Sequence, residues 1–171
     1  MKSSYVIQDV FHCSLERAFK APMLGDATQF MKGYLFQPPV SGFDEDDTWG
    51  NEQGVRYPLS NGNLFVSKGR MFRDVILVRA EQKYWKWKLH AFELKAMFFV
   101  DHAIGEWTVA IHSENTINVE YRYTYSAKHW LYIPVLWLFV QIQIRGIMIR
   151  AIKGIKEQAE SADAFIYEQR K

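Results

Sequence analysis

The stretch from His129 to Glu160, HWLYIPVLWLFVQIQIRGIMIRAIKGIKEQAE, constrains the fold most, because its first half is apolar enough for a membrane span and its second half is amphipathic. A bilayer span needs about 20 predominantly apolar residues, and here Gln141, Gln143 and Arg145 interrupt the run. One apolar stripe continues past them at helical spacing, which is typical of a core helix. We therefore predict a long helix over about residues 130–165 that covers a core. The stripe consists of Ile133, Leu136, Trp137, Val140, Ile144, Ile147, Met148, Ala151 and Ile155.

The beginning of this helix is apolar nearly all round, because Leu138, Phe139 and Ile142 lie away from the stripe. Exposed apolar surface of that extent marks contact with a partner or a membrane. One interpretation is that strand ends or the connection over residues 38–53 cover these side chains. The other is that they make a homodimer contact or a membrane-surface contact.

Residues 54–128 read as successive strands separated by short breaks such as NGN, EQK and EN. Runs joined this closely pair as an antiparallel meander. Alternating side chains predict one dry aromatic face and one charged face. Gly69 and Gly105 predict bulges or bends that reset which side chains face inward. The dry face contains Trp85, Trp87, Leu89, Ile117, Val119, Tyr121, Tyr123 and Tyr125.

The N-terminal part predicts a strand over residues 4–13, followed by two short helices. Ser14 is an N-cap residue, and the first helix is expected to be short because APMLGD breaks it at Pro22 and Gly25. Asp26 with Gln29 three residues later predicts a capping box for the second helix.

Length and composition favour a single globular domain over residues 1–171. The net charge of +2 comes with cations scattered among acids, so we expect no nucleic-acid partner. Cys13 is the only cysteine, which excludes an intramolecular disulfide. The N-terminus has no apolar run of the signal-peptide type, and we expect a cytoplasmic protein.

No metal or cofactor motif is present. The histidines lack HxxxH spacing, the cysteine lacks a CxxC partner, and GxSxG, GxGxxG and P-loop motifs are absent. The remaining acid–base candidates are Asp74, His102 and Glu106 in the strands. A carboxylate or imidazole walled by aromatic side chains has a perturbed pKa and can move a proton next to a carbonyl. The alternative is that each of them faces water or pairs with an arginine.

The order of elements resembles the helix-grip fold of the START and Bet v 1-like superfamily, whose bacterial members are labelled SRPBCC or polyketide cyclase/dehydrase-like. The resemblance is carried by VFHCSLERAFKAPMLGD, TWGNEQGVRYPL, YWKWKL and GEWTV. It implies an α+β fold: a strand, two short helices, a curved antiparallel sheet and a long C-terminal helix. It also implies a cavity between sheet and helix that holds a lipid, sterol, polyketide or other apolar molecule.

Three hypotheses follow for function. The first is binding or carriage of an apolar small molecule without turnover, and it is the one we favour. The second is a cyclase or dehydratase that uses Asp74, His102 or Glu106, and the third is docking through the start of the long helix. The expected cavity residues are Phe30 and Tyr34 on the second short helix, Trp85, Trp87, Tyr121, Tyr123 and Tyr125 on the sheet, and Trp137, Val140, Ile144 and Met148 on the long helix.

Overall fold

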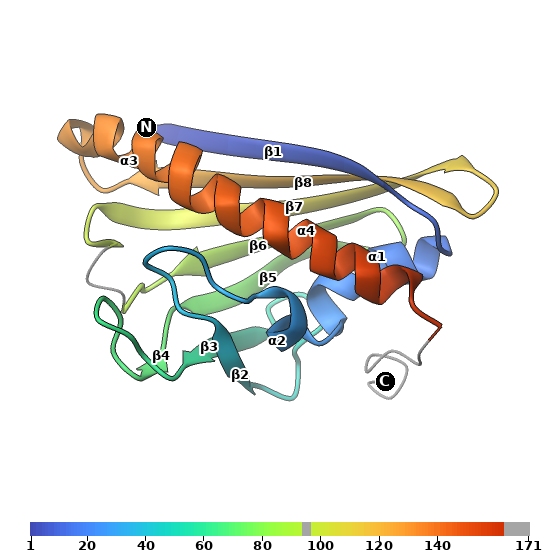
Figure 1. Ribbon diagram of the computed structural model, residues 1–171, viewed down its shortest axis with the longest axis horizontal. Coiled ribbons are helices and arrows are strands. Elements are labelled where there is room, and N and C mark those ends of the chain that lie inside the picture. Colours follow the sequence, from blue (N-terminus) through green and yellow to red (C-terminus); the bar gives the residue numbers. More distant parts are fainter. Residues whose placement is uncertain (94–96, 163–171) are drawn as a thin grey trace.

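A curved antiparallel sheet packs around one long helix in the computed structural model, which describes residues 1–93 and 97–162 (Figure 1). Seven strands follow the order β1-β8-β7-β6-β5-β3-β2, and the short β4 pairs with β3. The α+β architecture predicted from the sequence is confirmed. The strands are β1 (Lys2–Phe11), β2 (Val40–Glu45), β3 (Val55–Ser60), β4 (Gly69–Arg70), β5 (Arg73–Ala80), β6 (Tyr84–His90), β7 (Val100–Ser113) and β8 (Thr116–Ala127).

Two short helices, α1 (Leu15–Leu24) and α2 (Ala27–Phe30), connect the two edge strands of the sheet, β1 and β2. Ser14 caps α1 by accepting from the Arg17 N–H, and Asp26 caps α2 by accepting from the Thr28 N–H. The helix ends with Gly25 as its C-cap, as expected, but the expected break at Pro22 is wrong, because α1 continues to Leu24. Proline cannot donate to the carbonyl four residues earlier. That carbonyl, Ala18 O, instead accepts a hydrogen bond from Trp107 Nε1 at 3.1 Å.

The long helix runs from Trp130 to Glu160. It consists of a 3₁₀ turn (η2, Trp130–Tyr132), α3 (Ile133–Phe139), a π-helical turn (η3, Val140–Ile144) and α4 (Arg145–Glu160). The helix was predicted to extend to about residue 165. In the structure α4 ends at Glu160, and residues 163–165 lie outside the described part of the chain. By length and composition this helix could cross a membrane, yet here it is the core C-terminal helix that packs against the sheet (Figure 1).

The predicted stripe is buried on both sides of the π-helical turn, at Leu136, Val140, Ile144, Met148, Ala151 and Ile155. Trp137, expected on the buried stripe, is 57% exposed, whereas Ile152, expected off the stripe, is buried. Gln143 is also buried and donates from Nε2 to the Tyr34 carbonyl at 2.5 Å.

The dry face of the sheet is confirmed, since all eight of its predicted residues are buried. The expected bulge at Gly105 is wrong, because Gly105 pairs in regular register with Tyr123 and Trp87. A Cβ atom there would lie 2.1 Å from Cε2 of Trp87, so the glycine leaves room for the indole. The irregularities of β7 lie instead between Val100 and His102 and between Ile111 and Ser113. Gly69 lies in the two-residue β4. The stretch between NGN and EQK, which reads as one strand in the sequence, is therefore divided into β4 and β5.

Candidate functional site

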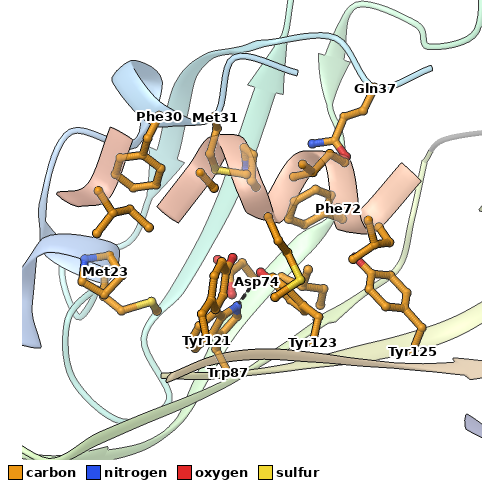
Figure 2. A pocket seen from close by; sticks show the side chains of 18 of the residues that line it. Met23, Phe30, Met31, Gln37, Phe72, Asp74, Trp87, Tyr121, Tyr123 and Tyr125 are labelled. Atoms are coloured by element: carbon orange, nitrogen blue, oxygen red, sulfur yellow. Dashed lines mark hydrogen bonds between the residues drawn. The ribbon is translucent and has the colours of Figure 1, made fainter. Parts of the chain in front are cut away.

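A small cavity of about 50 Å³ lies between the concave face of the sheet and the long helix (Figure 2). The strands contribute aromatic side chains and one ion pair, and the helix contributes aliphatic side chains and a methionine. The segments around α2 and the loops before β5 and β7 close the remaining sides. The lining residues are Pro22, Met23, Phe30, Met31, Gln37, Arg56, Pro58, Phe72, Asp74, Trp87, Leu89, Phe92, Met97, Tyr121, Tyr123, Tyr125, Ile144, Ile147, Met148, Ala151 and Ile155.

A buried ion pair forms the polar wall of this cavity. Arg56 on β3 lies opposite Asp74 on β5, and Arg56 Nε donates to Asp74 Oδ2 at 3.0 Å. The guanidinium also lies over the rings of Trp49 and Phe43, at 4.0 and 4.7 Å from their centroids. These contacts hold the arginine in place, because a planar cation is attracted to aromatic faces.

The Asp74 carboxylate is only partly satisfied. Its Oδ1 atom is buried and has no hydrogen-bond partner among the residues described. Burial raises the pKa of Asp74 from 3.8 to about 6, although the charge of Arg56 acts in the opposite direction. Asp74 therefore presents to the cavity an acceptor oxygen that can also take up a proton near neutral pH.

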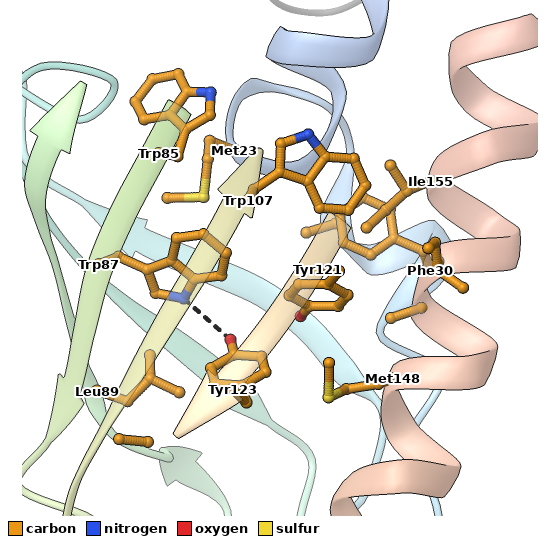
Figure 3. Close-up of a cluster of buried hydrophobic side chains, with 14 of the residues drawn as sticks. Met23, Phe30, Trp85, Trp87, Leu89, Trp107, Tyr121, Tyr123, Met148 and Ile155 are labelled. Atoms are coloured by element: carbon orange, nitrogen blue, oxygen red, sulfur yellow. Dashed lines mark hydrogen bonds between the residues drawn. The ribbon is translucent and has the colours of Figure 1, made fainter. Parts of the chain in front are cut away.

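A row of tyrosines on β8 lies next to this ion pair. Trp87 Nε1 donates to the Tyr123 hydroxyl at 3.0 Å, and the ring of Trp87 also packs against that of Tyr121 (Figure 3). Burial, followed by the charge of Asp74, raises the pKa of Tyr123 to about 12. Burial likewise raises the pKa values of Tyr121 and Tyr125 well above 10. All three phenols are neutral at physiological pH, so they offer hydroxyl groups without charge.

Seven of the eleven residues expected at a binding site line the cavity. Four do not, and each has a physical reason. Trp85 is buried under α1, where its Nε1 donates to Phe19 O at 2.8 Å. Val140 is fully buried in the core without lining the cavity, and Trp137 lies on the solvent-facing side of α3. The seven that line the cavity are Phe30, Trp87, Tyr121, Tyr123, Tyr125, Ile144 and Met148.

Tyr34, the fourth, lies after the end of α2 rather than within it. Its ring packs over Gly146, where a Cβ atom would lie 2.2 Å from Tyr34 Cε1. The guanidinium of Arg150 lies over the same ring at 4.6 Å. Tyr34 thus anchors the segment after α2 to the long helix and does not line the cavity.

Of the acid–base candidates, Asp74 alone faces the cavity. Glu106 accepts from the Tyr84 hydroxyl at 2.5 Å, and His102 Nδ1 lies 2.6 Å from Asp101 Oδ2. The other ring nitrogen of His102 lies 3.2 Å from Ser126 Oγ. Neither Glu106 nor His102 lines the cavity, and their partners satisfy them on the sheet.

Arg56 and three of the cavity methionines, Met23, Met31 and Met97, were not found from the sequence. Arg56 stands in a strand whose alternation, with Pro58 and Ser60 also buried, signals an inward face. An inward arginine becomes recognisable as a site residue only when its acidic partner is known, and that partner is 18 residues away. Among the described residues, no three His, Cys, Asp or Glu side chains cluster as a metal site.

Comparison with known proteins finds no matching family model and no matching curated sequence. Solved structures do match, at low identity. Truncated norcoclaurine synthase from Thalictrum flavum has a TM-score of 0.69 and 9% identity, over 95% of this chain and 96% of its own. Ara h 8.0201 has a TM-score of 0.65 and 11% identity, over 93% and 98%.

The di-domain ARO/CYC protein StfQ from the steffimycin biosynthetic pathway matches with a TM-score of 0.66 and 11% identity. The match covers 93% of this chain and 51% of StfQ. At these identities the likeness concerns the fold. This chain contributes to that likeness a seven-strand antiparallel sheet, two short helices between its edge strands and a long C-terminal helix. The chain has the helix-grip fold of the Bet v 1-like, or SRPBCC, proteins.

Proposed function

We propose that this protein binds or carries an apolar small molecule between the sheet and the long helix, with one polar group of the ligand directed at Asp74. The observation that carries the proposal is an apolar cavity whose wall contains a buried carboxylate oxygen, Asp74 Oδ1, without a partner. A buried acceptor without a donor costs about 1–3 kcal/mol. A hydroxyl or amine on the ligand would remove that cost.

The size of the cavity defines what binding requires. Small-molecule sites occupy roughly 300–1,000 Å³, whereas this cavity measures about 50 Å³. We infer that the structure represents a contracted state and that a ligand displaces side chains on entry. Methionine side chains are unbranched and adapt to new shapes. Four of them line the cavity, namely Met23, Met31, Met97 and Met148.

The chemistry of the wall narrows the ligand class. Phe72, Trp87 and Tyr121 present ring faces, and the long helix presents Ile144 and other aliphatic groups. Such a wall favours a flat or branched apolar body, and burial of that body contributes about 25 cal/mol per Å² before ordering costs. We therefore propose an aromatic, polyketide-like or lipid-like molecule with at least one hydroxyl or amine donor.

The comparisons support this class without naming the ligand. One norcoclaurine synthase structure from Thalictrum flavum is a complex with dopamine and hydroxybenzaldehyde. These are small aromatic molecules with polar groups, bound by a protein of the same fold. StfQ, which has the same fold, is a di-domain ARO/CYC protein from the steffimycin biosynthetic pathway.

Native mass spectrometry of the freshly purified full chain tests the proposal. We expect a discrete excess over the chain mass that disappears on denaturation. Ala151→Leu adds side-chain volume from the helix into the cavity and should abolish the excess. Ala110→Leu, on an exposed position of β7, is the matched control and should retain it. An excess that survives in a folded Ala151→Leu protein would contradict the assignment of the cavity.

A second candidate function, acid–base catalysis of the cyclase or dehydratase type, is favoured by one observation. Asp74 faces the cavity and has a pKa raised to about 6 by burial, which suits a group that takes and returns a proton near neutral pH. Its partner Arg56 also lines the cavity and supplies a positive charge for a developing oxyanion.

This second candidate can be tested on a simple ketone. The wild-type protein should accelerate exchange of the α-protons of an aryl methyl ketone with solvent deuterium, as followed by NMR. Asp74→Asn should remove the acceleration, and Glu106→Gln, outside the cavity, should not. Equal exchange rates with the wild-type protein and Asp74→Asn would leave binding as the only function of this site.

Contact of the start of the long helix with another surface also belongs to the proposal. Leu138 and Ile142 are about half exposed, as this contact requires. Phe139 is turned inward and packs on Phe99 and Tyr125, at centroid distances of 5.4 and 5.8 Å. Phe139 is therefore not available to a partner in this structure.

A further inference from the structure

Exposed apolar side chains gather at one end of the molecule. They come from the segment after α2, from the loop between β3 and β4, and from the N-terminal part of the long helix. We call these exposed side chains the apolar rim. Its most prominent members are Leu35, Phe36, Leu64, Phe65, Trp137 and Leu138, of which Leu64 is 97% exposed.

Direct contacts show that these segments are neighbours. The rings of Phe36 and Phe65 meet edge to face with centroids 5.2 Å apart. The segment after α2 is tied to the long helix by Gln143 Nε2, which donates to Tyr34 O at 2.5 Å. The 3₁₀ turn that begins the long helix contacts the β6–β7 loop, where Phe98 and Tyr132 lie 5.6 Å apart. In Figure 1 the β3–β4 loop lies below α3, toward the same end of the long axis of the molecule.

The cavity is closed at this same end. Met31 and Gln37 belong to the segment after α2, and Phe92 and Met97 belong to the β6–β7 connection. The opposite end of the core is closed by α1, whose carbonyls accept from buried tryptophans. The apolar rim therefore surrounds the part of the cavity that is made by loops rather than by regular elements.

The exposed residues of the long helix form a stripe of their own. Leu131, Leu138 and Ile142 follow one another at helical spacing, and Val135 falls between the first two. Trp137 lies beside the stripe. An exposed apolar stripe with tryptophan at its border is typical of helices that lie in a membrane interface.

The segments that carry the rim contain more cations than acids, and the acids nearby are Glu93 in the β6–β7 connection and Asp101 at the start of β7. From Ser126 to Arg150 the sequence contains no Asp or Glu, but it contains Lys128, Arg145 and Arg150. The segments 31–43 and 61–73 also lack acids and contain Lys32 and Lys68. The acid-rich β2–β3 connection lies away from α3 (Figure 1). Cations that flank an apolar surface are attracted to anionic lipid headgroups.

We propose that the apolar rim docks on the surface of an anionic lipid bilayer, with the long helix lying along the headgroup region. This inference rests on the proposed function, in that docking would bring the loop-closed end of the cavity against the membrane from which an apolar ligand is exchanged. A second copy of the chain is a poorer partner. A two-fold contact would place the same surface of both copies face to face, so that two surfaces with an excess of cations would meet.

The test uses the full chain and large unilamellar vesicles, in a sedimentation assay at low and at high salt. One set contains phosphatidylcholine alone, and the other contains about 30% phosphatidylserine, which supplies the surface charge. We expect binding to the anionic vesicles that weakens with salt. Lys128→Gln or Arg145→Gln should each lower the partition coefficient about fivefold. Binding that is absent, or equal for both vesicle types at all salt concentrations, would overturn the proposal.

Matched apolar variants locate the surface. Trp137→Glu and Leu64→Glu change exposed side chains of the rim and should each lower binding about tenfold or more. The control is Ile111→Glu, because Ile111 is 69% exposed but lies near the β7–β8 hairpin at the other end of the molecule (Figure 1). An equal loss with Ile111→Glu, or no loss with the rim variants, would refute the assigned surface.

Two further readouts separate this inference from its alternatives. Analytical ultracentrifugation that shows a dimer, dissociated by Leu138→Glu, would assign the rim to a second copy and would overturn membrane docking. Native mass spectrometry distinguishes docking from ligand binding, since Trp137→Glu should keep any bound mass, whereas Ala151→Leu should lose it and still bind vesicles. Failure of docking would thus leave the cavity proposal intact, and the reverse holds as well.

Discussion

Replacement of Asp74 by asparagine is the sharpest test of the polar wall of the cavity. Burial raises the pKa of this carboxyl group from 3.8 to about 6. It does so although the charge of Arg56, whose Nε lies 3.0 Å from Asp74 Oδ2, lowers the pKa. A carboxyl group whose pKa is higher in the folded state binds its proton more tightly there. The stabilisation from Asp74 is therefore fully present below about pH 4, and it is lost as the pH rises through about 6.

The magnitude follows from the shift. A difference of about two pKa units between folded and unfolded chains corresponds to about 3 kcal/mol over the whole transition. About 2 kcal/mol of this should develop between pH 7 and about 4.5, a range in which many proteins stay folded. Asparagine cannot titrate. The free energy of unfolding of the wild-type protein should therefore rise by about 2 kcal/mol relative to Asp74→Asn as the pH falls over this range.

The assay is urea denaturation at several pH values, followed by tryptophan fluorescence, with the difference between the two proteins plotted against pH. A constant offset is expected in addition, because Asp74→Asn leaves Arg56 without its partner. Asp44→Asn is the control, since it removes the exposed ion pair with Arg70 and should change stability by less than about 1 kcal/mol. Parallel pH curves for the wild-type protein and Asp74→Asn would refute the argument that burial dominates at Asp74.

Two further substitutions and one labelling reaction test the packing of the core. Gly105→Ala places a methyl group against the Trp87 ring and should lower stability by about 1–3 kcal/mol and weaken ligand binding, whereas Gly42→Ala, with open space around it, should do neither. Tyr123→Phe leaves the Trp87 N–H buried without its acceptor and should cost about 1–3 kcal/mol in urea denaturation; an unchanged midpoint would show that this hydrogen bond contributes nothing. Burial, followed by the charge of Glu160, raises the pKa of the Cys13 thiol to about 11, so labelling by a thiol reagent should be slow and should accelerate only on unfolding.

Much of the fold was predictable from local patterns. Strand alternation correctly placed every second side chain from Ile117 to Tyr125 on the inner face. Ser14 and Asp26 marked the starts of α1 and α2. These features were predictable because they depend on spacing along a single element. The helix that covers the sheet was predictable for the same reason, although Trp137 was assigned to the wrong side of it.

The tertiary structure decided which inward residues form the cavity. Trp85 and Trp87 share a face of β6, yet the indole of Trp85 bonds to α1 and that of Trp87 bonds to Tyr123 inside the cavity. The sequence could not distinguish them, because the difference lies in where α1 crosses the sheet. Asp74 and Arg56 likewise become an ion pair only through the register of β3 with β5. Periodicity determines which side of an element is buried, but only packing between elements distant in the sequence determines what that side meets.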